Sequence, residues 1–158
     1  MHLDHGRKDK YEHQFAGGNF RIDGLQAAVL NVKLKYLPQW TKNRQAHAKI
    51  YDDLLKPKGF KVLEPFAGSE SVYHLYVVEV SNRDEVIKHM QSKDIHVGVH
   101  YPITMSRQPA LQFLEPRHSE FVVSDRVASR IMSLPMYAEL TRAQIEQTVY
   151  EFLKVAAP

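Results

Sequence analysis

Residues 24–37 constrain the fold of this chain more than any other segment, because their helical repeat is apolar on two opposite faces. The apolar positions are Leu25, Ala28, Val29, Val32 and Tyr36 on one face, and Ala27, Leu30, Leu34 and Leu37 on the other. A helix with two apolar faces must be covered on both. Since one small domain covers one face, we expect a second domain or a second subunit to cover the other.

Size and charge narrow the classes of protein that this chain can belong to. A chain of 158 residues fits one domain with its own core. The net charge is +3, and the basic residues are scattered among acids. They form no continuous stripe for nucleic acid, whereas a phosphate-bearing ligand is compatible with the charge. We therefore expect no nucleic-acid partner.

The absence of cysteine excludes disulfides and thiolate metal sites. No metal site is expected at His2, Asp4 and His5 either, because three polar residues at a chain terminus rarely hold an ion. No apolar run is long enough for a bilayer, and residues 1–13 lack the apolar stretch of a secretory signal. These observations predict a cytoplasmic protein without a membrane partner.

The rest of the pattern predicts helices and short strands in alternation. Pro38 should kink the first helix, and Pro57 with Gly59 should end the second. Asn82 with Glu85, and Thr141 with Gln144, have the spacing of capping boxes at helix starts. The further expected elements are strands at 60–63, 72–80, 95–99 and up to Leu134, helices at 83–92 and about 119–130, a loop at 101–118 and a last helix after Thr141.

This order predicts an α+β fold in which a small antiparallel or mixed sheet packs on helices. The expected division has an extended arm or loop over residues 1–22, a long helix kinked at Pro38 over residues 23–57, and a small α+β domain over residues 58–158.

Five short motifs follow one another along nearly the whole chain. They are DHGRKDKYEH at 4–13, AGGNFRIDGLQAAVLNVKLKYL at 16–37, the spaced set Arg44, Ala48, Tyr51 and Leu54, HYP at 100–102, and SLPMYAELT at 133–141. In this order they resemble the DegT/DnrJ/EryC1/StrS family of sugar-nucleotide aminotransferases, which use pyridoxal phosphate. The resemblance implies the small C-terminal domain of a fold-type-I aminotransferase, preceded by an arm from the end of the large domain. It also implies that this chain is the carboxyl-terminal part of an enzyme, since the family's cofactor-binding lysine lies upstream of the matched motifs.

Two site residues are expected in the arm, and the resemblance assigns the role of the first. Asn19 is expected to reach across a homodimer and donate a hydrogen bond to the cofactor phosphate of the partner subunit, as an amide can. The alternative is that Asn19 caps a turn after two glycines. Arg21 is expected to pair with phosphate or with a carboxylate on the partner surface. Its alternative is an ion pair with Asp23 or another acid.

Three more residues are candidates for substrate binding. His100 and Tyr101 end a predicted strand and open a loop, where ligand contacts are common. The resemblance puts them near the nucleotide sugar, while an exposed histidine before a proline turn is the alternative. His5 could contact the ligand or the partner, or be a polar loop residue. After HYP the family often has a Pro-Leu-His run, but here residues 104–106 are TMS, which places a serine where a histidine commonly faces the substrate.

Amino transfer needs a lysine that holds the cofactor and an acid that pairs with its pyridinium nitrogen. No lysine in this chain has the family's Ser/His-rich context, so no catalytic residue is assigned to it. The resemblance implies that the complete protein transfers an amino group from an amino acid, glutamate by expectation, to a nucleotide-linked keto-sugar in amino-sugar or surface polysaccharide biosynthesis. The chain alone should be inactive. A non-catalytic binding or dimerisation module derived from the same fold is the alternative.

Overall fold

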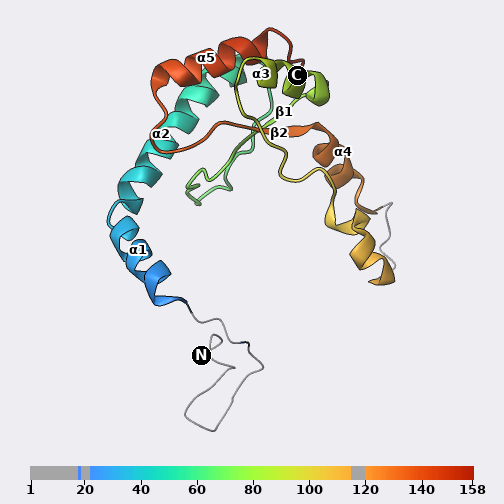
Figure 1. The fold of residues 1–158 in the computed structure, drawn as a ribbon. Helices are drawn as coiled ribbons and strands as arrows, with labels where there is room; N and C mark the ends of the chain where they lie inside the picture. The colour runs from blue at the N-terminus through green and yellow to red at the C-terminus, as the bar shows by residue number, and fades with distance from the viewer. Residues whose placement is uncertain (1–17, 19–21, 115–119) are drawn as a thin grey trace. The chain divides into compact units, whose positions relative to one another are not determined.

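A computed structural model describes residues 18, 22–114 and 120–158, apart from the side chains of residues 112 and 114 (Figure 1). The chain divides into two compact units, Met1–Pro38 and Gln39–Pro158. The division expected from the sequence, with boundaries after residues 22 and 57, stays a prediction.

Helix α1, Gly24–Leu34, belongs to the first unit. The Asp23 carboxylate caps it and accepts hydrogen bonds from the backbone N–H groups of Leu25 at 2.8 Å and Gln26 at 3.3 Å. None of the α1 residues, all of which are described, is buried. The helix ends three residues earlier than predicted, and the next helix already begins at Leu37. Pro38 therefore lies in the first turn of that helix, where a missing N–H costs nothing.

Helix α2, Leu37–Leu55, buries Ala48, Tyr51 and Leu55 in the second unit. A short 3₁₀ helix, η1, Lys56–Lys58, continues it. Gly59 then adopts a left-handed backbone with φ of 84°, as predicted for a glycine that ends a helix.

The sheet is smaller than the sequence indicates. Strand β1, Tyr76–Glu79, pairs antiparallel with β2, Ile131–Leu134, so that Tyr76 lies opposite Leu134. The strands expected at 60–63 and 95–99 each contribute only an isolated bridge, from Val62 to Val78 and from Gly98 to Ser133. Pro65 and Pro102 follow these bridges and have no N–H with which to extend a ladder.

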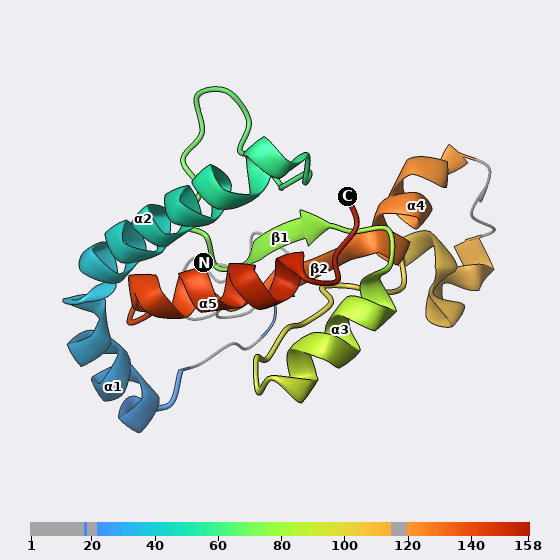
Figure 2. The same cartoon turned by 90° about the horizontal axis from the view of Figure 1, so that it is seen from above.

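Three helices pack with the sheet into one core. Besides α2 these are α3, Arg83–Ser92, and α5, Arg142–Leu153, and Figure 2 shows α5 between the other two. Their largest fully buried side chains, with those of the strands, are Tyr51, Phe152, Leu55, Met90, Met132, Ile145, Val78, Val80 and Val86. The α+β fold predicted from the sequence is confirmed by this arrangement. Within the described segments, no helix combines the length and the apolar content needed to cross a membrane.

The two predicted capping boxes have different outcomes. The box of Thr141 and Gln144 forms at the start of α5 with both of its hydrogen bonds. The box at Asn82 is wrong, because its backbone, with φ of −116° and ψ of 46°, is not in the extended conformation of a cap. Its amide instead donates to the Val155 carbonyl at 2.8 Å and accepts from the Ala157 N–H at 3.0 Å, which ties the C-terminal segment to α3.

The segment predicted as a loop at 101–118 contains two 3₁₀ helices in its described part, η2, Met105–Arg107, and η3, Pro109–Leu114. Helix α4, Val122–Arg130, follows and leads directly into β2. Only Ala128 of α4 is buried. Figures 1 and 2 show α4 with these turns at the opposite end of the second unit from α2.

Candidate substrate-binding groove

The structure describes two of the five residues predicted for the site. His100 and Tyr101 are described, whereas His5, Asn19 and Arg21 lie outside the described residues. The roles of these three stay predictions.

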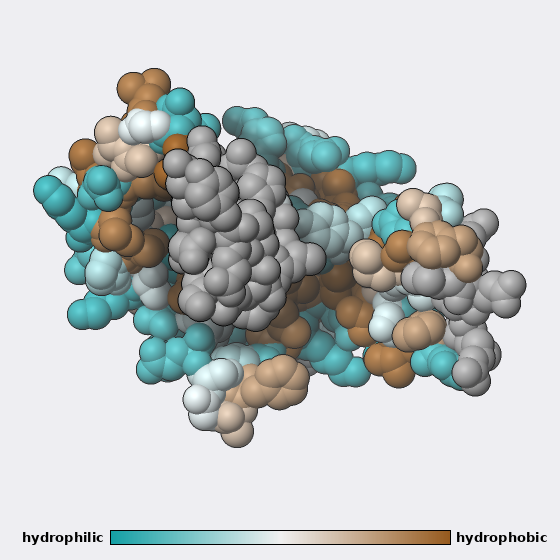
Figure 3. Space-filling model, turned by 90° about the horizontal axis from the view of Figure 1, so that it is seen from below, coloured by the Kyte–Doolittle hydropathy of each residue, from teal (hydrophilic) through white to brown (hydrophobic). Residues whose placement is uncertain are grey.

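A groove of about 730 Å³ opens directly after the HYP motif. One wall is the turn that follows His100 and includes η2, and the other is the start of α4. The lining residues are Tyr101, Pro102, Ile103, Thr104, Met105, Ser106, Gln108, Leu111, Phe121 and Ser124. On the right of Figure 3, apolar side chains lie at this end of the second unit among more polar ones. The groove is therefore mainly apolar, with a few hydroxyl groups and one amide.

His100, which directly precedes the first residue that lines the groove, is anchored to the sheet. Its Nδ1 lies 3.0 Å from Oγ of Ser133, which is buried in β2. The rings of His100 and Tyr101 meet edge to face with their centres 5.6 Å apart, and Tyr101 is 73% exposed. Ser133 is the first residue of the SLPMYAELT motif, so this contact brings together two motifs that are separate segments in the sequence. Its membership of that motif was the signal that could have identified Ser133 as a site residue.

Gly98 makes room for the histidine ring. A Cβ atom at this position would lie 2.7 Å from Cε1 of His100, closer than side-chain atoms tolerate. The absence of a side chain at Gly98 and the hydroxyl of Ser133 together set the orientation of His100.

Asp125 connects the two walls of the groove. Its Oδ1 accepts a hydrogen bond from Oγ1 of Thr104 at 2.7 Å, and its Oδ2 accepts two from the Arg107 guanidinium at 2.9 and 2.7 Å. This pairing with Asp125 raises the pKa of the Arg107 guanidinium. Thr104 also lies 3.1 Å from Oγ of Ser106. Sequence reasoning missed Asp125, because nothing in the local pattern shows that it meets a turn about twenty residues earlier.

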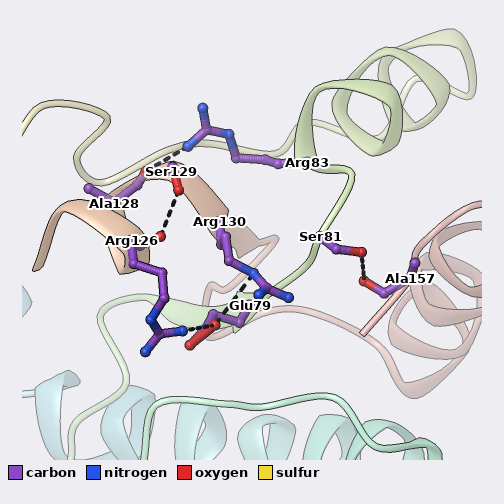
Figure 4. A network of polar contacts seen from close by, with 8 residues as sticks. All are labelled: Glu79, Ser81, Arg83, Arg126, Ala128, Ser129, Arg130 and Ala157. Atoms are coloured by element: carbon purple, nitrogen blue, oxygen red, sulfur yellow. Dashed lines mark hydrogen bonds and ion pairs between the residues drawn. The ribbon is translucent and has the colours of Figure 1, made fainter. Parts of the chain in front are cut away.

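Helix α4 is fixed to the sheet by charged groups (Figure 4). Glu79, at the end of β1, pairs with Arg126 at 3.2 Å and with Arg130 at 3.6 Å. From the start of α3, Arg83 donates to the carbonyl of Ala128 at 2.7 Å. These contacts set the position of α4, and with it one wall of the groove.

The groove can bind a ligand, but its described lining does not fit the cofactor that the sequence implies. Among the described residues that line it there is no lysine and no carboxylate, the two groups that a pyridoxal ring needs. A flat or apolar ring with a few polar groups suits this lining better.

Comparison with known proteins gives a consistent result. The model of the DegT/DnrJ/EryC1/StrS aminotransferase family matches residues 2–153. A UDP-2-acetamido-2-deoxy-3-oxo-D-glucuronate aminotransferase of Pseudomonas aeruginosa is 35% identical over 142 residues, which are 90% of this chain and 39% of that protein. A pleiotropic regulatory protein of Geobacillus stearothermophilus is 34% identical over 148 residues, which are 92% of this chain and 40% of that protein.

A solved structure is similar to almost the whole chain. The crystal structure of DesV from S. venezuelae superposes with a TM-score of 0.84 at 29% identity, and the match covers 96% of this chain and 42% of DesV. The chain thus spans about 40% of the length of the curated relatives it matches.

Proposed function

The chain belongs to the DegT/DnrJ/EryC1/StrS aminotransferase family. On this basis we propose that it is part of a pyridoxal-phosphate-dependent aminotransferase. In this proposal the complete protein moves an amino group from an amino acid, glutamate by expectation, to the keto group of a nucleotide-linked sugar for amino-sugar or surface polysaccharide biosynthesis. This chain supplies the small domain and part of the sugar-nucleotide site.

The observation that carries the proposal is the groove between the turn after His100 and the start of α4. Tyr101 and Phe121 offer aromatic surface to a base or a sugar ring, and the hydroxyl groups of Thr104 and Ser106 offer polar partners. In the proposal His100 and Tyr101 contact the nucleotide sugar at the mouth of this groove.

In the proposal the arm, residues 1–22, contacts the cofactor and the second subunit of the dimer. When bound in the complete protein, pyridoxal phosphate supplies the electron sink that amino transfer needs. Asn19 donates to its phosphate from the neighbouring subunit of a homodimer, while Arg21 and His5 contact phosphate, substrate or partner. The part of this chain that the structure describes binds and orients the sugar nucleotide. A cytoplasmic location stays a prediction.

One observation favours a second candidate, a binding or dimerisation module without catalysis. Helix α1 carries exposed apolar side chains on both faces, among them Leu25 at 79% and Leu34 at 63% exposure. A surface of this kind serves assembly whether or not the complete protein is a catalyst. One of the matched relatives is itself named a regulatory protein.

A chimera tests the proposed function against this alternative. The chain replaces the matching 39% of the Pseudomonas aeruginosa relative, and amino transfer from glutamate to that relative's keto-sugar nucleotide is measured. We expect transfer that depends on added pyridoxal phosphate. A chimera with Phe66→Ser, at a loop residue that is 90% exposed and outside the groove, is the matched control and should keep the activity. A folded, dimeric chimera that binds the cofactor but transfers nothing would support the non-catalytic module instead.

A further inference from the structure

We propose that Ser106 faces the groove as a hydrogen-bond acceptor only, so that the groove selects a ligand with a hydrogen-bond donor at this place. The inference rests on the proposed function and deepens it, because it names a residue that determines specificity. It follows from the direction of the hydrogen bonds among four side chains, namely Arg107, Asp125, Thr104 and Ser106.

The direction of these hydrogen bonds is set first at Asp125. A carboxylate is ionised at neutral pH and can only accept hydrogen bonds. Its contact with Oγ1 of Thr104, at 2.7 Å, must therefore use the single hydroxyl hydrogen of that threonine. The other carboxylate oxygen is occupied by Arg107, at 2.9 and 2.7 Å, which holds the carboxylate in place.

The next contact then has only one possible direction. Oγ of Ser106 lies 3.1 Å from Oγ1 of Thr104, and either hydroxyl could donate if the pair stood alone. Because Thr104 has given its hydrogen to Asp125, Ser106 must donate to Thr104. Ser106 has then used its own hydrogen, and what its oxygen can still offer is lone pairs.

These lone pairs belong to a side chain that lines the groove, next to apolar neighbours such as Met105. A ligand donor that meets them gains a hydrogen bond, whereas a ligand acceptor in the same place meets another acceptor and leaves both unpaired. A net hydrogen bond corresponds to about a 2- to 13-fold difference in affinity. Two parts of a nucleotide sugar carry such donors, namely the N3–H of a pyrimidine base and the hydroxyl groups of the sugar.

Affinities of the 158-residue chain for paired probes test the inference. The reference probe is UDP-glucose, and its dissociation constant is measured by ligand-observed saturation-transfer NMR, which tolerates self-association of the protein. One arm uses the N3-methyl analogue, which lacks the base donor, and the other uses deoxyfluoro analogues, which lack single sugar donors. We expect one arm to lose about 5- to 10-fold in affinity, and that arm identifies the donor.

Variants then test whether this discrimination depends on the hydrogen bonds from Ser106 to Thr104 and from Thr104 to Asp125. Ser106→Ala should remove it by weakening the reference probe alone. Thr104→Val keeps the Arg107–Asp125 pair but releases the Ser106 hydrogen. A deoxyfluoro analogue, whose fluorine can accept that hydrogen weakly, should then regain part of its affinity, whereas the N3-methyl analogue, which has no acceptor in that place, should not. Ser92→Ala, at an exposed serine of α3 outside the groove, is the matched control and should retain the wild-type affinity and discrimination.

The outcomes separate two failures. If the wild-type chain binds all probes equally well, or if Ser106→Ala keeps the discrimination, the inference falls and the proposed function stands. If the wild-type chain does not bind UDP-glucose, or if Met105→Arg in the groove leaves binding unchanged, the sugar-nucleotide groove itself is wrong and the inference falls with it.

Discussion

At the scale of single residues, the orientation of His100 depends on the absence of a side chain at Gly98. The ring occupies the space of a Cβ atom and lies 3.0 Å from the Ser133 hydroxyl. A histidine that is exposed to solvent would otherwise sample several rotamers. The turn into the groove therefore begins with a side chain whose direction is fixed by the sheet.

Gly98→Ala should displace the His100 ring and break its contact with Ser133, because the new Cβ would lie 2.7 Å from the ring. We expect a loss of about 0.5–1.5 kcal/mol in the free energy of unfolding and a change in the ¹H–¹³C signals of the His100 ring. Gly24→Ala is the control, because nothing lies within 4 Å of a Cβ at that position. Unchanged His100 signals in Gly98→Ala would contradict this account.

Two stacked tyrosines should make the folded chain less stable at alkaline pH. The rings of Tyr51 and Tyr76 lie 4.7 Å apart in the core, and burial raises the pKa of both phenols, with a further contribution at Tyr76 from its hydrogen bond to Asp52. In the unfolded chain a tyrosine loses its proton near pH 10, while the folded chain retains it. The folded-state pKa is the higher one, so the stability is complete below about pH 10 and is lost as the pH rises further.

Denaturant unfolding between pH 8 and 11 should accordingly show a constant free energy up to about pH 10 and then a decline of about 1.4 kcal/mol per pH unit for each tyrosine. Tyr51→Phe and Tyr76→Phe should each reduce the slope of that decline. Tyr150→Phe, at a tyrosine that is 60% exposed, is the control and should leave it unchanged. A slope that both core variants retain would show that other groups cause the decline.

At the scale of elements, α1 is a helix with exposed apolar side chains on both of its faces. Leu30 and Leu34 are 53% and 63% exposed on one face, and Leu25 and Val29 are 79% and 55% exposed on the other. Fully burying one such side chain is worth roughly 1.5–3 kcal/mol. The isolated chain should therefore self-associate through α1.

Leu30→Lys with Leu34→Lys should shift the isolated chain towards a monomer without unfolding the second unit, as light scattering and circular dichroism would report. Lys33→Ala, between the two faces of the same helix, is the control and should leave self-association unchanged. A wild-type chain that stays monomeric at high concentration would contradict the inference that α1 is an assembly surface.

The elements also show where sequence patterns are informative. The helix after Thr141 could be predicted, because its apolar spacing and its capping box are local signals. The helix at 83–92 has the predicted bounds, although the capping box from which it was predicted does not form. The side strands could not be separated from single bridges at Val62 and Gly98, because the length of a ladder depends on its partner. In the site, HYP pointed to the groove, but its second wall and the role of Asp125 depend on contacts between distant segments.

At the scale of the whole molecule, we propose that the described groove binds the sugar nucleotide and that the cofactor lysine is not among the residues of this chain. Incubation of the chain with pyridoxal phosphate, followed by borohydride reduction and mass spectrometry, should therefore give scattered, low labelling of lysines. The physical reason is that no lysine lines the groove in the part of the chain that the structure describes. Stoichiometric labelling at one lysine would overturn this expectation.

The predicted dimer can be tested through Asn19. In the complete enzyme Asn19→Ala should weaken cofactor retention by about ten-fold or more, the loss expected for a hydrogen bond to a charged phosphate. The effect should act across the subunits. Mixed dimers of this variant with a subunit that lacks the cofactor lysine should regain activity at one site, and no gain over either mutant homodimer would assign Asn19 to a turn only.

The attachment of α4 has a thermal consequence. This helix buries one alanine, and its other attachments include the ion pairs of Glu79 and Asp125 with arginines and the hydrogen bond from Arg83 to the Ala128 carbonyl. Apolar burial carries a large heat capacity and weakens on cooling. These ion pairs, whose arginines are 33–50% exposed, respond instead to ionic strength. The core of this small domain should therefore loosen in the cold, whereas the groove wall should loosen in concentrated salt.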